Sequence, residues 1–234
     1  MGFLFLLSII LPCTFPRICA AHREDYIDET LVFLTLERAS FEPEYWFDAG
    51  RETDAHRNLI RHSLAAEYGI TEHLMMDGRV SFKQETSDPL RFESGRFESR
   101  YRFGEEGERP VDLAISGEIN VARSISGENE YGLEPRLIFS KDFADLNLTV
   151  NLPLEISLNN GAATLAPAFG IRYDASELFR MGSEIKYDTD HHAGAVIPQI
   201  WLGLSKSLTL KAGYSQDFAQ NRERFFRLAL EAEL

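Results

Sequence analysis

Charged side chains recur at every second position in one stretch of the chain. Arg96, Glu98, Arg100 and Arg102 alternate with uncharged residues. Successive side chains of a β-strand point to opposite faces, so these four would share one face. A row of guanidinium groups could favour anions, as rings of charged side chains do in selective pores. The chemistry indicated is selection of ions or small solutes rather than covalent catalysis.

The same alternation places further charged residues on the polar faces of other segments. We predict that these side chains line the interior of the protein: Arg61, Arg79, Arg96, Arg100, Arg102, Glu118, Glu134, Arg136, Glu155, Arg172, Glu184 and Lys186. Two interpretations stay open. The charges line a narrow aqueous pore, or they pair across strands in a salt-bridge network that closes the interior.

Catalytic and metal-binding patterns are weak. His62 and Ser63 are neighbours in a predicted strand, so they point to opposite faces and do not form a dyad. His191 and His192 lie in a predicted loop, and no spacing matches a zinc or calcium motif. We predict no catalytic residue, no metal site, no cofactor and no enzyme activity. A lipid hydrolase of the membrane-barrel type is the alternative from another class.

The clearest element that could position the charged residues spans 146–158. Apolar residues occupy every second position there: Leu146, Leu148, Val150, Leu152, Leu154, Ile156 and Leu158. About a dozen such segments follow one another over residues 41–234, and each has one face without formal charge. This pattern predicts an all-β fold, a transmembrane antiparallel up-and-down β-barrel of about twelve strands with short turns and loops.

Two segments fit the pattern less well. The eighth is predicted over 165–173, with Pro167 on its outward face. The tenth, over 195–204, has two nearly apolar faces, so its phase stays open. A soluble, secreted β-sandwich that binds a ligand is the rival fold, because its strands also alternate. A sandwich has no need of charge-free faces, whereas a Lys or Arg facing lipid at mid-depth costs about 2–4 kcal/mol.

The chain divides into three parts. Residues 1–21 resemble a secretory signal, with an apolar run of residues 3–11 that is too short to span a bilayer as a helix. Residues 22–40 form an N-terminal lead-in that is apolar on both faces over 31–36, either periplasmic or a short inner segment. Residues 41–234 form the transmembrane β-barrel.

Composition restricts the possible partners. The formal net charge of -13 argues against nucleic acid. Both cysteines, Cys13 and Cys19, lie in the predicted signal, so the mature chain would have no disulfide and no thiolate metal site. A mean hydropathy of -0.22 is compatible with a barrel, because only half of a barrel strand faces lipid.

One phrase, Glu67-Tyr68-Gly69-Ile70-Thr71-Glu72-His73-Leu74, resembles a strand-turn-strand phrase of small Gram-negative outer-membrane barrels. These barrels are catalogued as transporters or as putative phenol-degradation MetA-like proteins. Residues 134–152 resemble a later hairpin of the same group. The resemblance implies an outer-membrane barrel without catalytic residues. The chain departs from the usual barrel by ending in Leu234 instead of an aromatic residue.

Together these patterns predict a monomeric barrel of the cell outer membrane, exported through a cleaved signal. We expect a small-solute channel or transport-type protein with a mixed-charge, Arg-rich lumen. A structural barrel closed by salt bridges is the alternative. The expected partners are outer-membrane lipid, periplasmic chaperones, the barrel-assembly machinery and small solutes that the sequence does not name.

Overall fold

The computed structural model describes residues 25–28, 30–52, 57–86, 88–123, 127–190, 192–217 and 223–234. The predicted signal over residues 1–21 lies outside this part of the chain. Every element of regular secondary structure in the described residues is a β-strand. None of the described residues forms a helix that is long and apolar enough to cross a membrane.

The described residues form thirteen strands. The first seven are β1 (Phe41–Glu52), β2 (Arg57–Thr71), β3 (Leu74–Glu85), β4 (Arg91–Arg102), β5 (Asp112–Arg123), β6 (Asn129–Phe143) and β7 (Leu146–Ser157). The others are β8 (Ala163–Leu165), β9 (Ala168–Ser176), β10 (Phe179–Asp188), β11 (Ala193–Ser205), β12 (Leu208–Asp217) and β13 (Glu223–Ala232).

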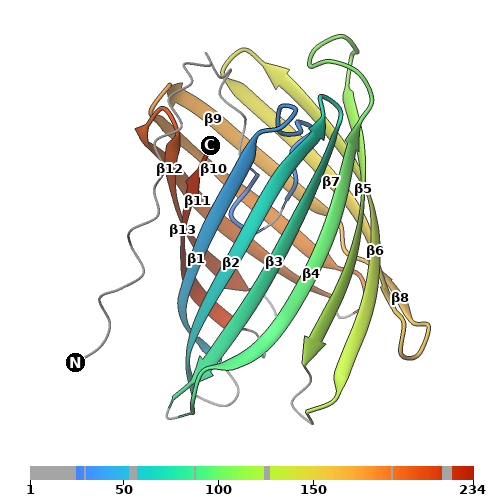
Figure 1. The fold of residues 1–234 in the computed structure, drawn as a ribbon, viewed down its shortest axis with the longest axis vertical. Helices are drawn as coiled ribbons and strands as arrows, with labels where there is room; N and C mark the ends of the chain where they lie inside the picture. Colours follow the sequence, from blue (N-terminus) through green and yellow to red (C-terminus); the bar gives the residue numbers. More distant parts are fainter. Residues whose placement is uncertain are drawn as a thin grey trace.

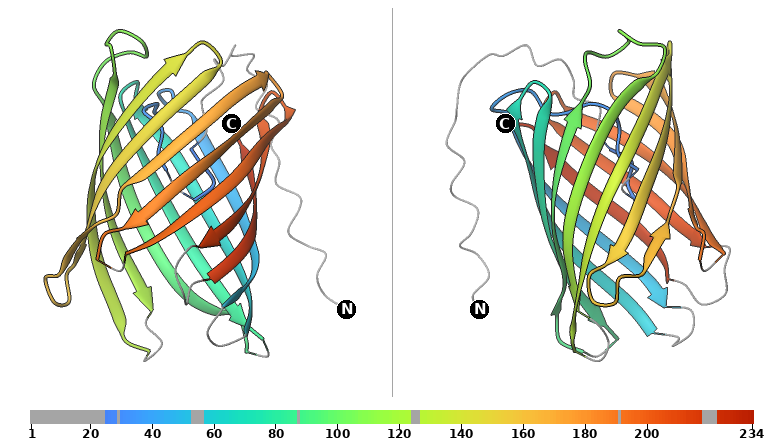
Figure 2. Two further views of the ribbon diagram at one scale, coloured as in Figure 1. Left: turned by 180° about the vertical axis from the view of Figure 1, so that it is seen from behind. Right: turned by 90° about the vertical axis from the view of Figure 1, so that its right-hand side faces the viewer.

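Twelve of these strands close into a ring (Figure 1). Each long strand pairs antiparallel with its neighbours along the chain, and β1 pairs with β13 to complete the cylinder. Within the part of the chain that the structure describes, β8 pairs with β7 alone. The predicted twelve-stranded antiparallel up-and-down barrel is therefore confirmed. The tilt of the strands, which closure of a barrel requires, is plain in the views of Figure 2.

The two ends of the barrel differ in their connections. At the end that holds the C-terminus, four of the five connections between strands are two residues long, such as the turn between Thr71 and Leu74. We call this the short-turn end and the opposite one the loop end. Backbone hydrogen bonds between Phe41 and Leu234 join the first and last strands at the short-turn end.

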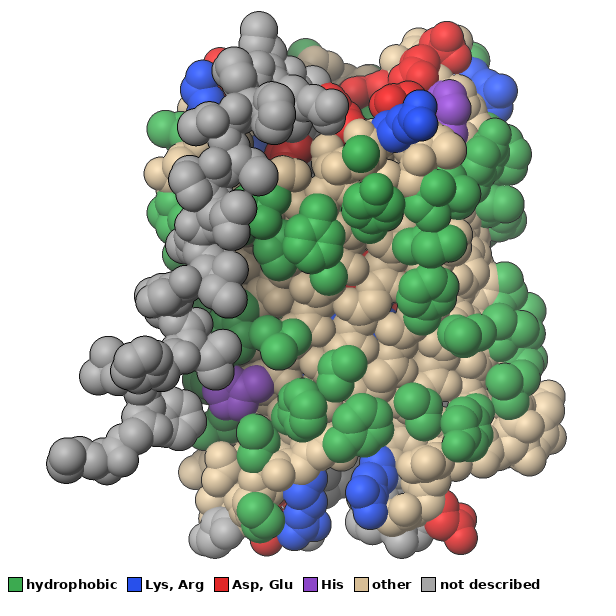
Figure 3. Space-filling model, viewed as in Figure 1, with side chains coloured by type: hydrophobic (Ala, Val, Ile, Leu, Met, Phe, Trp, Pro, Cys, Tyr) green, Lys and Arg blue, Asp and Glu red, His purple; other side chains and the backbone are tan. Residues whose placement is uncertain are grey.

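The outer face of the wall is apolar. Figure 3 shows hydrophobic side chains spread over the visible face, with acidic and basic side chains gathered at the two ends. Large apolar side chains in the middle of strands remain exposed, for example Leu64 at 60% and Ile119 at 57%. Charged residues such as Glu98 and Arg100 are buried on the opposite face. The alternation in the sequence thus places apolar residues outside and charged residues inside.

The predicted eighth strand is interrupted at Pro167. Strand β8 ends at Leu165, and β9 begins at Ala168. Proline has no N–H to donate to a neighbouring strand, so a long strand through this position would lose a hydrogen bond. The outward residues Phe169 and Tyr173 of β9 keep the predicted phase, at 37% and 46% exposed.

Candidate functional site

The interior of the barrel contains part of the chain itself. Residues 25–36, of which residue 29 lies outside the described part, enter from the short-turn end and lie inside the ring of strands (Figures 1 and 2). We call them the lumenal segment. Tyr26, Ile27, Thr30 and Leu36 are all 0% exposed. Of the two positions considered for residues 22–40, the structure therefore places 25–36 inside the wall.

Polar side chains of the wall bind the backbone of the lumenal segment. Such partners are needed because the segment belongs to no sheet, and buried N–H and C=O groups must be satisfied. The side chain of Asn151 accepts a hydrogen bond from the N–H of Leu31 at 2.8 Å and donates one to its carbonyl at 2.9 Å. The carboxylate of Glu184 accepts from the N–H of Asp28 at 2.5 Å and from the hydroxyl of Thr30 at 2.7 Å.

Two arginines of the wall also hold the segment. Arg100 donates to Asp25 at 2.5 Å and to the carbonyl oxygens of Val32 and Leu34, each at 3.2 Å. Burial alone would raise the pKa of Asp25, but the charge of Arg100 and the hydrogen bonds outweigh it and hold the pKa below its ordinary value. Asp25 therefore stays ionised and paired.

Arg227 forms the second such link. Its Nη1 atom lies 3.0 Å from both the carbonyl oxygen of Ile27 and a carboxylate oxygen of Asp28. Its Nε and Nη2 atoms bind Asp48 of the wall at 2.6 and 2.7 Å. One guanidinium thus bridges the wall and the segment, which fixes both in one geometry.

Apolar contacts complete the fit. The ring of Tyr26 meets that of Trp201 edge-on, with 5.6 Å between centroids. Ile27 packs in a buried cluster with Trp46, Ile197 and Ala229. These inward apolar residues explain why strand β11 reads as apolar on both faces: one face meets the exterior, and the other meets the lumenal segment.

A second apolar cluster lies on the opposite part of the wall. Leu31 and Phe33 of the segment contact Ala114 of β5 and Ile138 of β6, and all four are buried. The apolar residues on both sides of the segment therefore find partners inside the barrel, which accounts for its two-faced pattern.

The twelve residues predicted to line the interior fall into three groups by the exposure of their side chains. Seven are buried: Arg79, Arg100, Arg102, Glu118, Arg136, Arg172 and Glu184. Four are partly buried: Arg61, Arg96, Glu134 and Lys186. Glu155 is exposed near the loop end.

Most of these charges form ion pairs with one another or with their neighbours. Arg96 lies 3.3 Å from Asp77 and 3.5 Å from Glu118. Arg136 pairs with Glu134 on the same strand. The aliphatic and aromatic residues on the outer face offer no such partners, so these ion pairs form within the barrel. Features of both earlier interpretations are present, since a charged lining and a paired network use the same side chains.

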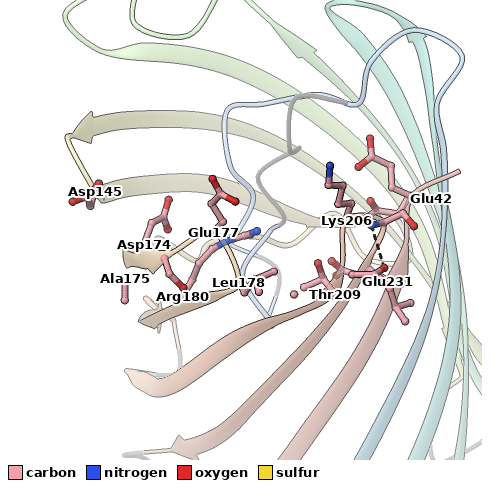
Figure 4. A pocket seen from close by; sticks show the side chains of 16 residues that line it. Glu42, Asp145, Asp174, Ala175, Glu177, Leu178, Arg180, Lys206, Thr209 and Glu231 are labelled. Carbon is pink, nitrogen blue, oxygen red and sulfur yellow. Dashed lines mark hydrogen bonds between the residues drawn. The ribbon is translucent and has the colours of Figure 1, made fainter. Parts of the chain in front are cut away.

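Cavities lie on both sides of the lumenal segment. One of about 670 Å³ opens at the short-turn end, between the β9–β10 and β11–β12 turns on one side and Glu42 and Glu231 on the other (Figure 4). Another of about 460 Å³ lies at the loop end and is lined by Glu155, Lys186 and Asp28. Asp28 belongs to the lumenal segment and lies 3.3 Å from Lys186. The segment therefore contributes directly to the surface of the loop-end cavity.

Several interior residues did not stand out in the sequence as candidates. Trp46, Asp48 and Trp201 contact the segment or the arginines that hold it. The sequence does contain a signal for Trp46 and Asp48. They alternate with the apolar residues that face outward in β1, so they must face inward. Asn151 and Gln199 carry no charge, so a search for charged lining residues passes over them.

Comparison with known proteins supports the fold. No protein-family model and no curated protein matches the chain. Among solved structures, the COG4313 outer membrane channel from Pseudomonas putida F1 superposes with a TM-score of 0.64 at 11% identity, covering 91% of this chain and 100% of that one. The KdgM porin gives 0.61 at 10% identity, covering 82% and 98%. The NanC porin gives 0.56 at 11% identity, covering 81% and 100%. The chain therefore shares the closed antiparallel β-barrel fold of outer-membrane channels and porins.

Proposed function

We propose that the protein is a small-solute channel of the outer membrane whose lumen is closed by the lumenal segment in the state described. The observation that carries this proposal is the position of residues 25–36 between two cavities, inside a wall lined with charged side chains. The fold shared with the COG4313 channel and the two porins supports the same function.

The membrane location rests on the outer face. Its exposed aliphatic and aromatic side chains would be unfavourable in water and favourable against lipid hydrocarbon. Short turns are typical of the periplasmic side of such barrels, so the short-turn end would face the periplasm. Export through a signal at residues 1–21, delivery by periplasmic chaperones and insertion by the barrel-assembly machinery as a monomer belong to this proposal.

The lining residues would act once the segment moves. Arg96, Arg100, Arg102, Arg136 and Arg172 would then face solvent and favour anions, while Glu118, Glu134 and Glu184 would moderate that preference. Membership in the group of transporters or putative phenol-degradation MetA-like proteins is also part of the proposal, supported by the turn phrase at 67–74 and by residues 134–152.

Single-channel recording in planar bilayers tests the function. The mature protein, refolded and checked by its heat-modifiable migration in gels, is compared with a variant that lacks residues 22–36. Removing the segment should raise the unitary conductance, because it deletes the atoms that separate the two cavities. Asn160→Ala, in an exposed turn of the wall, serves as a folded control that keeps the segment and its contacts.

A structural barrel is the second candidate, favoured by the ion pairs among Arg96, Asp77 and Glu118. If the folded deletion variant shows no discrete openings, the salt-bridge network closes the lumen by itself and the channel proposal fails. If both proteins conduct equally, the segment is not the barrier.

A further inference from the structure

Three carboxylates meet on the inner wall near the short-turn end. Glu42 and Glu44 lie on β1, and Glu67 lies directly opposite Glu42 on β2. One oxygen atom from each side chain lies within 4.8 Å of the others. The exposed fractions are 4%, 6% and 7%, so all three are buried.

This arrangement is costly without a positive charge. Like charges directly opposite each other on neighbouring strands are destabilising, and a carboxylate taken out of water needs a compensating partner. Glu44 has such partners, because its Oε2 atom accepts hydrogen bonds from the indole of Trp46 at 2.6 Å and from Arg79 at 3.2 Å. Both bonds go to the same oxygen, which leaves Oε1 of Glu44 available.

Glu67 differs from its neighbour. Among the described residues its carboxylate makes no hydrogen bond and no ion pair, although it is more than nine-tenths buried. One of its oxygens lies within 4.8 Å of an oxygen of Glu42 and of an oxygen of Glu44. A buried carboxylate this close to two others indicates that a positive charge belongs between them.

We propose that Glu42, Glu44 and Glu67 bind a divalent cation, Ca²⁺. Ca²⁺ takes oxygen ligands at 2.3–2.6 Å in flexible geometry, and the three carboxylate oxygens lie within 4.8 Å of one another, close enough to share one ion. Mg²⁺ needs near-ideal octahedral geometry and is usually held by one or two carboxylates and several waters, so a site with three carboxylates suits it less well. Arg79 offsets the charge of Glu44, and a divalent ion would offset that of Glu67.

The site has access to solvent. Glu42 lines the cavity at the short-turn end, as Figure 4 shows. Six acidic residues and two basic ones, Arg180 and Lys206, line that cavity. Its charge would draw cations toward the wall, and water in the cavity could complete the coordination shell.

The ion would join β1 to β2 where the chain leaves the wall to enter the lumen. Hydrogen bonds from Ala39 to the carbonyl of Gly69 at 2.7 Å, and from Gly69 to that of Ser40 at 3.0 Å, mark the same place. A bound cation would therefore stabilise the base of the lumenal segment. Binding of the cation does not require the barrel to conduct, so the site can be tested independently of the channel proposal.

Terbium luminescence tests the site directly. The indole nitrogen of Trp46 is 2.6 Å from Glu44, so Tb³⁺ bound by these carboxylates would be sensitised by that ring. Full-length mature protein is refolded in detergent without lipopolysaccharide, treated with a chelator and titrated with Tb³⁺. We expect a saturable signal that Ca²⁺ displaces. Trp46→Phe should abolish the signal, whereas Trp201→Phe should keep it.

Charge-neutral variants of the ligands separate specific from surface binding. Glu67→Gln should weaken Tb³⁺ binding at least about tenfold, since ligand charge sets the affinity of such sites. Glu155→Gln, which alters an exposed acid at the loop end, should leave the affinity unchanged. Should Glu67→Gln fail to fold, Glu42→Gln provides the same comparison.

Thermal unfolding gives an independent measurement. Ca²⁺ should raise the unfolding temperature of the wild type and have no effect on Glu67→Gln. Without Ca²⁺ that variant should unfold at the same temperature as the wild type or above it, because one of the opposed charges is gone. A wild type that does not respond to Ca²⁺, together with a Tb³⁺ signal that Glu67→Gln leaves intact, would show that the carboxylates share protons instead of an ion.

Discussion

The Nη2 atom of Arg100 lies 2.5 Å from a carboxylate oxygen of Asp25, and the two residues are 75 positions apart in the chain. Arg100 belongs to the wall, and Asp25 belongs to the segment inside it. The arginine predicted to face an aqueous path is thus engaged with the chain's own N-terminal part. Any role of Arg100 in ion selection requires that this contact first be broken.

Replacing Arg100 should loosen the segment. Arg100→Gln removes the ion pair with Asp25 and weakens the bonds to the carbonyl oxygens of Val32 and Leu34. We expect more frequent openings in planar bilayers than the wild type shows. Arg61→Gln is the matched control, because Arg61 pairs with Asp48 and Glu93 of the wall. Equal opening frequencies for the two variants would contradict the assignment.

Asn151 offers a test of the backbone contacts. Asn151→Ala removes both hydrogen bonds to Leu31 and leaves a buried N–H and a buried C=O without partners. Unsatisfied buried groups cost about 1–3 kcal/mol each, so we expect the free energy of unfolding to fall by about 2 kcal/mol or more.

Urea titration of protein folded into lipid vesicles measures this change. The control is Asn160→Ala in an exposed turn, where substitution should cost within about 0.5 kcal/mol. If Asn151→Ala is no less stable than the control, the segment does not occupy the lumen in the membrane.

The sequence predicts the wall of this barrel better than its contents. Alternation identifies strands such as β7 because each side chain of Leu146–Ser157 reports which face it occupies. The lumenal segment has no such period, since residues such as Val32 and Phe33 are enclosed on all sides. Its contacts join residues more than a hundred positions apart, as Leu31 and Asn151 are. No pattern in one stretch of sequence specifies such a pair.

For the candidate interior residues, the sequence likewise predicts the face that a side chain occupies but not the partner that it binds. Periodicity placed Arg172 and Glu184 on the inner face, where both are 0% exposed. It could not say which would bind the segment, as Glu184 does, and which would pair within the wall, as Arg172 does with Asp174. Those partners depend on closure of the ring, which brings distant strands together around one volume.

Charge reversal should change ion preference only after the segment is removed. In the variant that lacks residues 22–36, Arg100→Glu combined with Arg102→Glu should shift the reversal potential toward cation preference, because the lining changes sign at two positions. In the full-length protein the same two substitutions should shift the reversal potential less. Reversal potentials measured across a salt gradient, with and without the segment, test this prediction. An unchanged value in the deletion background would remove these two arginines from the conduction path.

The cost of a charge on the outer face should depend on its depth in the membrane. Leu64 lies in the middle of β2 and Leu178 in the turn between β9 and β10, and both are 60% exposed. Arginine at mid-depth costs about 2–4 kcal/mol and near the interface about 0–1 kcal/mol. Urea unfolding in vesicles should therefore rank Leu64→Arg well below Leu178→Arg in stability. Because the two leucines are equally exposed, a soluble barrel would tolerate both substitutions alike, and equal costs would show that water, not lipid, surrounds the wall.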